Sequence, residues 1–458
     1  MCHVTVSIED WAEQNFGSCE LGDARRRRRA VQVARTMAEY PNGSTPDQFE
    51  NWADLKAAYR LFDCKQVSFE ALATPHWQNT RAQASGVVLL LGDTMETDFG
   101  IRRSVTGLGP TGDGYGLGFM LHSSLMVQAD DGEIVGLAGQ ELFYRQPAPA
   151  NENSYQALQR PRESEVWGRV IDQVGRPAED VTYIHVFDRG ADNLEVFCHL
   201  LEQKSDWVIR AAQLHRKVHG DADERMSVNE LISQQPVLGT YRLGVRAAGK
   251  RSARNTKMEV RAVQATIRKP KRRTPYLKEK CFKELTQWIV EVREVNPPRG
   301  ETPLRWVLWT SLKVDSFDAA WTVIEYYERR WLIEEFHKAI KTGCRLESRQ
   351  YATADRLEAV AGIISVLAVR LVQLKTIART QPNRPAKEIV PSEWLEMLQA
   401  QRKVQVETVR DFFRHLAGLG GFLMRKRDGE PGWITIWRGT EKLLQLLRGY
   451  HAMRKRSG

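Results

Sequence analysis

Two aspartates each follow a short apolar run. Asp93 comes directly after GVVLLLG (86–92), and Asp188 comes directly after VTYIHVF (181–187). Uninterrupted apolar runs of this length indicate strands that are buried on both faces. The carboxyl ends of such strands face the crevice in which an α/β sheet binds its ligands. Two aspartates there repel each other, so the pair favours a divalent-cation site, although a strand-end aspartate can also merely cap a helix or turn.

A third acid lies in WTVIEYYERRWLIEEFHKAIK (321–341), which reads as a helix. Glu335 falls beside the polar face of this helix, so Glu334 is the better candidate ligand. A solvated face of mixed charge gives a similar pattern, but one acid among cations resembles a metal ligand within a phosphate-binding surface. Trp331, Phe336 and Ile340 fall on other faces, and some of them are expected to pack. At 100° per residue, a face about 80° wide collects Tyr327, Arg330, Glu334, Lys338 and Lys341.

The segments before the first acid read mainly as helix. Residues 1–70 are predicted to be helical, with one helix capped by Asp23 and another over 52–62. The glycine-rich segment 107–118 contains GxGxxG, but strand-like alternation follows it, with a hairpin turn at 130–132. A dinucleotide fingerprint needs a helix at that point, so this segment is interpreted as a loop between strands.

The segments around the second and third acids alternate in type. A helix over 164–174 precedes the strand that leads to Asp188. Residues 232–314 contain several strand-like runs broken by basic and Pro/Gly segments, which indicates a β-rich insertion. From Ser316 the chain reads as helical again, and the proline-containing segment 382–391 is interpreted as a linker.

Positive charge is concentrated rather than spread. The chain of 458 residues carries 67 Lys and Arg against 57 Asp and Glu, a formal net charge of +10. Thirteen Lys and Arg lie within 246–280 against two glutamates, a local net charge of +11. Five consecutive arginines occupy 25–29. A single such run is often a solvated face, whereas several separate ones favour an extended polyanion as partner.

Other classes of protein fit the sequence less well. Six cysteines without a CxxC pair indicate neither a disulfide framework nor a zinc site. The apolar run 359–369 is far shorter than the roughly 20 residues of a membrane span. No GxxxxGK[ST] motif is present in the sequence. We therefore expect a cytoplasmic protein; its association with the nucleoid of a bacterial cell is implied by the family resemblance given below.

At these residues the chain resembles a known family. Tyr327-x2-Arg330-x3-Glu334-x6-Lys341, together with Asp93 and Asp188, is similar to the signature of the insertion-sequence-four class of DDE transposases. Further matching segments follow in order along nearly the whole chain: LGDARR (21–26), AAYRLF (57–62), VFDRGAD (186–192), NPPRGETPLRW (296–306), RRWLIEEFHKAIKTG (329–343), AVRLVQL (368–374) and LGGF (419–422).

The resemblance implies an α/β fold with three parts. Residues 1–70 would form a helical DNA-binding domain, and 71–375 an RNase H-like catalytic core, a mixed sheet flanked by helices, with a β-rich insertion at about 232–314. Residues 376–458 would form a helical dimerisation domain. Asp93, Asp188 and Glu334 would hold two Mg²⁺ ions per active site, for which Mn²⁺ can substitute.

The resemblance also implies DNA contacts. Trp306 matches a position that stacks on a flipped base in such enzymes, although by composition it reads as core. Trp306 and Trp309 are three apart in a strand, so they are expected to face opposite ways. Single arginines are often plain salt-bridge residues. The remaining implied contacts are Arg25, Arg26, Arg29, Arg60, Arg210, Tyr327, Arg330, His337, Lys338, Lys341 and Arg349.

The implied activity is cut-and-paste DNA transposition by a homodimer assembled on DNA. The enzyme would bind terminal inverted repeats, cleave by hydrolysis and 3′-OH attack through a hairpin, and join the ends to target DNA. Three alternatives remain at this point. They are a non-catalytic DNA-binding relative, an RNase H-like nuclease without strand transfer, and an RNA-binding factor, which leaves the three acids unexplained.

Overall fold

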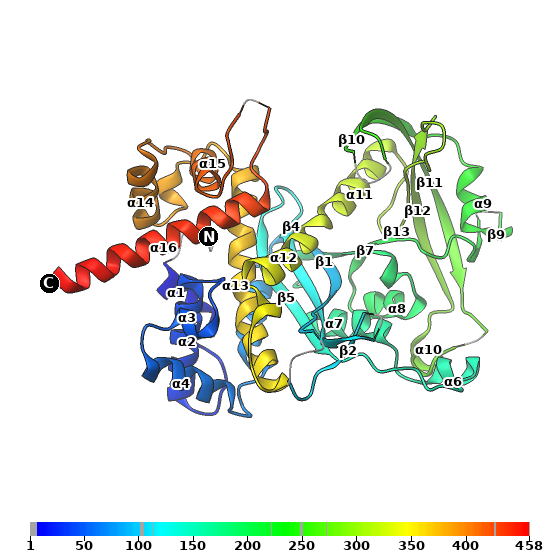
Figure 1. Ribbon diagram of the computed structural model, residues 1–458. Helices are drawn as coiled ribbons and strands as arrows, with labels where there is room; N and C mark the ends of the chain where they lie inside the picture. The colour runs from blue at the N-terminus through cyan, green and yellow to red at the C-terminus, as the bar shows by residue number, and fades with distance from the viewer. Residues whose placement is uncertain are drawn as a thin grey trace.

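The computed structural model describes residues 7–100, 105–112, 114–220, 222–247, 251–271, 273–425 and 427–457. Lys250 and Arg272, two cations of the basic stretch 246–280, lie outside the described residues. Helices at the two chain ends lie on one side of a large sheet, and the strand-rich segment extends on the other (Figure 1).

The N-terminal part is helical, as predicted. Asp23 caps α2 by accepting a hydrogen bond from the Arg25 amide, and the helix buries Val33 and Met37 on one face. The predicted helix over 52–62 is confirmed with the same bounds. The helices are α1 (Ile8–Phe16), α2 (Ala24–Glu39), α3 (Thr45–Gln48), α4 (Trp52–Phe62) and α5 (Phe69–Ala82).

The central sheet is mixed. The half that carries Asp93 has the order β5-β4-β1-β6-β7, in which β1 pairs antiparallel with β4 and parallel with β6. Asp93 does not end its strand as expected, because pairing with β4 carries β1 on to Glu96. These strands are β1 (Gly86–Glu96), β4 (Met120–Gln128), β5 (Ile134–Phe143), β6 (Val181–Phe187) and β7 (Asp206–Arg210); β2 (Gly109–Thr111) and β3 (Gly116–Gly118) form a separate small sheet.

The predicted strand-rich segment continues the same sheet. β13 pairs antiparallel with β7 through Trp309 and Ile209, so the strand order runs on through β13-β12-β11-β8-β9, with β10 beside β11. Its elements are β8 (Lys217–His219), β9 (Arg225–Ser227), α9 (Val228–Ser233), β10 (Gly239–Val245), β11 (Arg254–Arg268), α10 (Pro275–Lys280), β12 (Glu284–Val295) and β13 (Arg305–Thr310).

Alternate residues of β1 enter two different cores. Leu89 and Leu91 pack with the N-terminal helices and α13, whereas Val88 and Leu90 pack with α7 and α8. The result is a large mixed sheet flanked by helices, as in an RNase H-like DDE domain. The helices on these faces include α7 (Val166–Val174), α8 (Leu194–Glu202), α11 (Phe317–Arg329), α12 (Trp331–Lys338) and α13 (Ala354–Thr380), whereas α6 (Ser154–Gln159) buries no side chain; short 3-10 turns lie at Glu163–Glu165, Arg189–Ala191 and Leu346–Ser348.

Helix α13 is the long central helix of the molecule (Figure 1). By length and composition its 27 residues could cross a membrane, but 89% of the apolar window is buried inside the protein. It therefore serves as a core helix. It also runs through residue 375, where the sequence suggested a domain boundary.

The C-terminal helices have a small core of their own. Ile377 at the end of α13 packs with Leu398, Phe412 and Leu443 from the three helices that follow. The proline-rich segment 382–391 contains only a short 3-10 turn, Ala386–Glu388. The three helices are α14 (Ser392–Arg402), α15 (Val409–Leu419) and α16 (Trp433–Ser457).

Candidate active site

Parallel pairing brings the two aspartates together. Gly92 of β1 is paired with Phe187 of β6, so Asp93 and Asp188 are the next residues on neighbouring strands. Asp93 Oδ1 accepts a hydrogen bond of 2.8 Å from the Thr94 amide, and Asp188 Oδ1 accepts one of 2.7 Å from the Gly190 amide. In each carboxylate one oxygen is thus oriented by the backbone, which fixes the direction of the other.

Gly92, the residue before Asp93, leaves room for close packing against β1. A Cβ at Gly92 would lie 2.3 Å from a ring carbon of Phe187 and 3.3 Å from Trp167. Trp167 and Phe187 contact each other edge to face at 4.9 Å, forming an aromatic layer behind the two strands. Gly92 therefore allows that layer to pack directly against the strand that carries Asp93.

Helix α12 presents the third acid. The predicted helix over 321–341 is divided at Arg330, whose backbone remains helical, and it ends in a π-helical turn, Ala339–Gly343. The buried side chains Ile333 and Phe336 fix α12 on the sheet, where it packs against β1. Glu334 is left on the side that faces Asp93, with its side chain 30% exposed.

Arg330 joins two of the acids. Its Nη1 lies 3.2 Å from Asp93 Oδ2, and its Nη2 lies 2.5 Å from Glu334 Oε1. The arginine side chain is only 16% exposed. A single guanidinium therefore lies between a carboxylate of the sheet and a carboxylate of the helix.

The carboxyl group of Asp93 has an unusual affinity for protons. Burial, followed by the negative charge of Asp188, raises its pKa to about 6, although the Thr94 amide and Arg330 act in the opposite direction. Glu334 adds a smaller repulsion. The three acids therefore form a site where negative charge is destabilised and a cation is favoured.

The donor chemistry suits a hard divalent cation, because carboxylate oxygens are the ligands that such ions prefer. Among the residues that the structure describes, however, no group of three or more His, Cys, Asp or Glu side chains is arranged so that it could hold a metal ion. Arg330, which holds Glu334, is the cation that lies among the acids. The carboxylate oxygens of Asp93, Asp188 and Glu334 are suitable ligands for a divalent cation, and the Arg330 guanidinium lies between Asp93 and Glu334.

Two histidines, the buried His122 and the partly buried His337, lie close to the acids, and sequence reasoning missed the first of them. His122 of β4 is opposite Thr94 in the strand ladder, and its Nδ1 is 2.7 Å from Thr94 Oγ1. Burial lowers the pKa of His122 to about 3, and burial with the nearby cations Lys341 and Arg330 lowers that of His337 to about 3. Both rings are therefore neutral. The sequence signal that could have identified His122 was a histidine inside a segment that reads as a buried strand.

The cations of the helix face remain near the surface. Lys338 is exposed, and its Nζ lies 4.5 Å from the centre of the Trp331 ring. Lys341 is paired with Glu347 at 3.0 Å, and Tyr327 is half-buried against the core. Phe336 and Ile340 pack as expected, whereas Trp331 is 50% exposed and lies beside Lys338.

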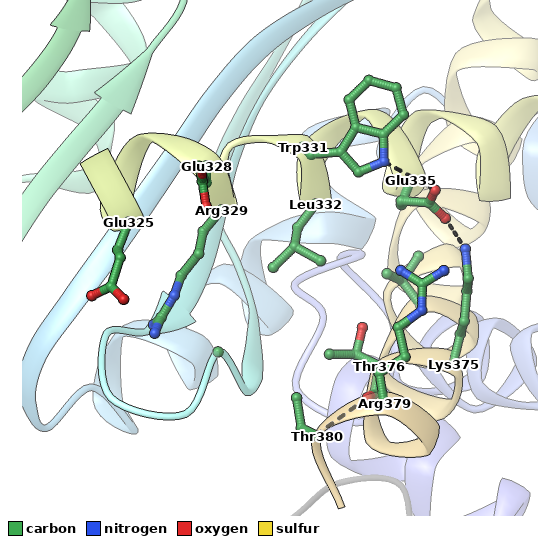
Figure 2. Close-up of a pocket in the computed structure, with 12 residues that line it drawn as sticks. Glu325, Glu328, Arg329, Trp331, Leu332, Glu335, Lys375, Thr376, Arg379 and Thr380 are labelled. Carbon is green, nitrogen blue, oxygen red and sulfur yellow. Dashed lines mark hydrogen bonds and ion pairs between the residues drawn. The ribbon is translucent and has the colours of Figure 1, made fainter. Parts of the chain in front are cut away.

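A pocket behind α12 contains the contacts that hold this helix on the side away from Glu334 (Figure 2). It has a volume of about 380 Å³ and lies between α11, α12 and α13. Inside it Glu335 forms a buried ion pair with Lys375 of α13 and accepts a hydrogen bond of 3.3 Å from the Trp331 indole. Glu335 therefore anchors α12, while Glu334 faces the aspartates.

The two tryptophans of β13 face opposite ways, as predicted. Trp309 is fully buried in the core beneath α7 and α8. Trp306 is opposite Val292 of β12 and packs only partly against the core on the other face. Of the two, Trp306 is the side chain with part of its surface accessible.

The five arginines expected to recognise DNA ends differ in their freedom. The side chain of Arg25 is 87% exposed, and Arg60 is exposed in the last turn of α4. Arg26 donates to the Leu21 carbonyl, and Arg29 pairs with Asp54 at 2.9 Å. Arg210 ends β7 and is partly exposed.

Arg349 is placed inside the molecule rather than at its surface. It is 2% exposed, and its guanidinium donates to the carbonyls of Pro41, Gly43 and Cys344 and to Gln48 Oε1. These hydrogen bonds connect the loop after α2 to the segment that follows α12. A DNA contact by this guanidinium would require them to break.

The basic stretch 246–280 is less positive in space than in sequence. Arg254 pairs with Glu294 and Glu301, and Arg268 pairs with Asp223 and Glu284. These four acids lie outside the stretch, so a count along the sequence omits them; Arg261 and Lys280 are also paired. In the part of the stretch that the structure describes, the cations without an ion pair are Arg246, Arg251, Lys257, Lys269, Lys271, Arg273 and Lys278.

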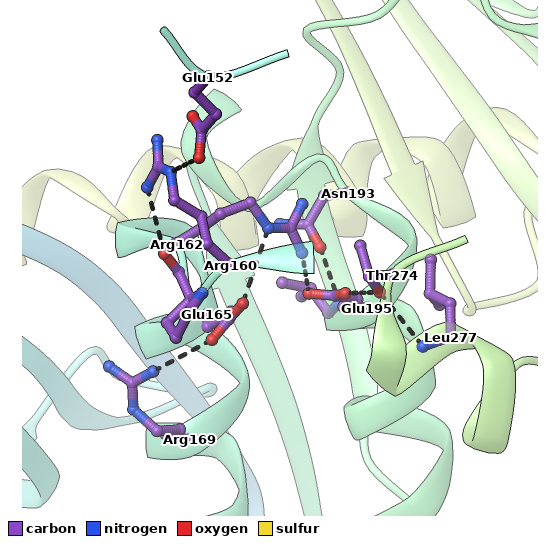
Figure 3. A network of polar contacts seen from close by, with 11 residues as sticks. Glu152, Arg160, Arg162, Glu165, Arg169, Asn193, Glu195, Thr274 and Leu277 are labelled. Carbon is purple, nitrogen blue, oxygen red and sulfur yellow. Dashed lines mark hydrogen bonds and ion pairs between the residues drawn. The ribbon is translucent and has the colours of Figure 1, made fainter. Parts of the chain in front are cut away.

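A polar network fixes the insertion to the core (Figure 3). Glu195 of α8 accepts a hydrogen bond of 2.6 Å from Arg162 and a short one from Thr274. Thr274 also caps α10 by accepting from the Leu277 amide. The network therefore connects the basic end of β11 to the helix that follows Asp188.

Comparison with protein families gives two matches. Residues 8–67 match the family model Transposase DNA-binding, and residues 157–370 match the family model Transposase DDE domain. The second match includes Asp188, Glu334 and the strand-rich segment but begins after Asp93. The chain thus combines a transposase DNA-binding domain with a DDE domain, which supports a DDE transposase, a class of metal-dependent enzymes that cleave and transfer DNA.

Proposed function

We propose that this protein is a cut-and-paste DNA transposase of the insertion-sequence-four class, similar to the Tn-five transposase. It binds terminal inverted repeats, pairs two ends as a homodimer, and transfers them to target DNA. The observation that carries this proposal is the convergence of Asp93 and Asp188 from paired strands with Glu334 from α12. The arginine and lysines beside them supply the phosphate-binding side of such a site.

Asp93, Asp188 and Glu334 are the residues that would hold two divalent ions, which we take to be Mg²⁺. When bound, such ions activate a water or a 3′-OH and stabilise the leaving oxygen. The remaining roles belong to the protein. Arg330, Lys338 and Lys341 orient phosphates next to the scissile bond, and the neutral His122 and His337 limit the positive charge behind the acids.

Trp306 would serve the hairpin step of the reaction. Its partly accessible ring can stack on a base that leaves the duplex, and such stacking can offset an unpairing cost of a few kcal/mol. Arg25, Arg26, Arg29, Arg60 and Arg210 would contact the inverted repeat. The exposed Arg25 and Arg60 need no rearrangement to do so, whereas Arg29 must leave Asp54.

The test is metal-dependent cleavage of a duplex that carries the inverted repeat flanking this reading frame. Glu334→Gln should reduce strand cleavage by at least about a hundredfold, since even residues that only support metal ligands affect activity by 10–100-fold. Glu328→Gln is the matched control, because Glu328 is an exposed acid six residues earlier that touches none of the three acids among the described residues. Cleavage that survives Glu334→Gln would refute the assigned site.

The same substrate separates a transposase from an RNase H-like nuclease. A transposase joins the cleaved 3′ ends to a second DNA, whereas a nuclease releases them. Analytical ultracentrifugation with end DNA should give a complex of two chains and two ends. A complex that is active but contains a single chain would contradict the proposed dimer.

A further inference from the structure

Arg330 has a second set of partners besides the phosphates proposed above. Its guanidinium contacts Asp93 at 3.2 Å and Glu334 at 2.5 Å, and among the described residues it is the one cationic side chain that is ion-paired with two of the three acids. Asp93 and Glu334 come from different elements, β1 and α12. The arginine therefore neutralises the same carboxylates that the proposed function assigns to metal.

We propose that Arg330 is a displaceable counter-ion that couples metal binding to DNA binding. A divalent cation and this guanidinium compete for Asp93 and Glu334, and a DNA phosphate takes the guanidinium when the cation enters. The inference rests on the proposed function and adds to it a reason why the site is completed only on DNA. Arg330 thus acts as a positioning residue as well as a phosphate contact.

Competition follows from the distances. Glu334 Oε1 cannot accept a charge-assisted bond of 2.5 Å from Arg330 and also bind a hard cation in the same direction. Removal of the guanidinium without a new partner would leave it poorly compensated in a site where it is mostly buried. A phosphate is a suitable new partner, because its oxygens match the planar fork of an arginine.

The surroundings allow the side chain of Arg330 to turn while its backbone stays fixed. The neighbouring Arg329 donates to the carbonyls of Gln128, Ala129 and Asp130 in the turn between β4 and β5. That anchor holds the junction of α11 and α12 to the sheet. Among the described residues, the Arg330 side chain hydrogen-bonds only to the two carboxylates and has no such backbone anchor.

The coupling must act in both directions. If DNA raises the affinity for a divalent cation by releasing Arg330, the cation raises the affinity for DNA by the same factor. Without DNA the cation must displace the guanidinium unaided, so binding is weak. The arrangement would restrict cation binding to chains that already hold DNA.

The first experiment measures Mn²⁺ binding to the full chain without DNA by isothermal titration calorimetry. Arg330→Gln should bind Mn²⁺ about tenfold more tightly than the unmodified protein, because the competing cation is gone. Arg345→Gln is the matched control: it removes the same charge from an exposed position that has no ion pair with the three acids among the described residues, so its affinity should change less than twofold. Arg330→Lys keeps the charge without the fork and should fall between them.

The second experiment locates the ion on the protein in the presence of DNA. Fe²⁺ with ascorbate and peroxide cleaves the polypeptide next to a bound iron, and mass spectrometry identifies cuts near Asp93, Asp188 and Glu334. In the unmodified protein, the inverted-repeat duplex should increase these cuts severalfold. In Arg330→Gln the cuts should be strong already and should not respond to DNA. Thermal unfolding of each variant checks that it is folded.

The outcomes separate the two proposals. Equal Mn²⁺ affinity in the unmodified protein and Arg330→Gln, with binding abolished by Glu334→Gln, would overturn the counter-ion role and leave the proposed function intact. Binding that no triad substitution affects, with or without DNA, would overturn both. An equal gain of affinity in Arg345→Gln would show a general charge effect and would also overturn the inference.

Discussion

At the scale of single residues, the fold makes the negative charges of the candidate site unfavourable. Asp93 carries this most clearly, because burial and Asp188 raise its pKa to about 6 while an unfolded aspartate titrates near about 3.9. The folded protein therefore binds more protons than the unfolded chain between these values. The free energy of unfolding must fall as the pH rises through this window, and the loss is complete above about pH 6.

This predicts an effect of Asp93→Asn on stability. In buffer with chelator, the variant should have a higher Tm than the unmodified protein at pH 7.5, since the repelled charge is absent. The difference should shrink as the pH falls from 6 to 4, where the carboxyl of the unmodified protein becomes protonated. Differential scanning calorimetry at several pH values checks this. A Tm difference that stays constant with pH would contradict the assigned cause.

At the scale of elements, the positions of β1 and α12 depend on close packing at a few points. Gly92→Ala places a methyl group 2.3 Å from the Phe187 ring, so strand or ring must move. We expect a loss of about 1–3 kcal/mol in the free energy of unfolding, with a larger loss of DNA cleavage because Asp93 moves too. Gly244→Ala is the control, since its Cβ would meet only Asn255 Oδ1 at 3.4 Å. Urea unfolding of both variants measures the difference.

The buried pair behind α12 gives a second prediction at this scale. Lys375→Met leaves the Glu335 carboxylate buried with the exposed Lys338, 3.8 Å away, as its remaining ion-pair partner among the described residues, which should reduce the free energy of unfolding by about 3 kcal/mol. The double variant Glu335→Leu/Lys375→Met should recover most of that loss, because no buried charge remains. Chemical denaturation of the single and double variants tests this. If the double variant is as unstable as the single one, the pair is not the source of the effect.

Local signals in the sequence predicted the elements well, and long-range partners could not be predicted. Asp23 and the bounds of α4 and β6 follow from caps and periodicity, which depend on neighbouring residues. The contact of Arg330 with Asp93 spans 237 positions, and the burial of Arg349 depends on a loop about 306 positions away. Such contacts arise only when the sheet and helices are assembled.

At the scale of the whole molecule, ion pairs between distant segments decide where free positive charge lies. Arg268 and Lys269 are adjacent in sequence, but Arg268 pairs with Asp223 and Glu284 whereas Lys269 has no ion pair among the described residues. Arg254, Arg261 and Lys280 are paired in the same way, so four of the eleven cations that the structure describes in the basic stretch are engaged. The surface available to a polyanion is therefore narrower than the net charge of +10 suggests.

This difference predicts the salt dependence of DNA binding. Lys269→Gln should reduce the slope of log affinity against log salt concentration by about 0.9, the value for one lost phosphate contact. Arg268→Gln removes the same charge, but its guanidinium is already engaged, so the slope should change little. Fluorescence anisotropy between 50 and 300 mM salt, about the range over which such slopes are resolved, measures both variants. Equal changes would show that ion pairing does not decide which cations contact DNA.

The join between β7 and β13 has a mechanical consequence. Three residue pairs, from Leu308–Arg210 to Thr310–Val208, connect the strand-rich half of the sheet to the half that carries Asp93. A load that bound DNA places on the outer strands can reach β6 and Asp188 through this short seam and through the network of Arg162, Glu195 and Thr274. The stiffness of these connections therefore sets how much of a pull on the outer strands is transmitted to Asp188.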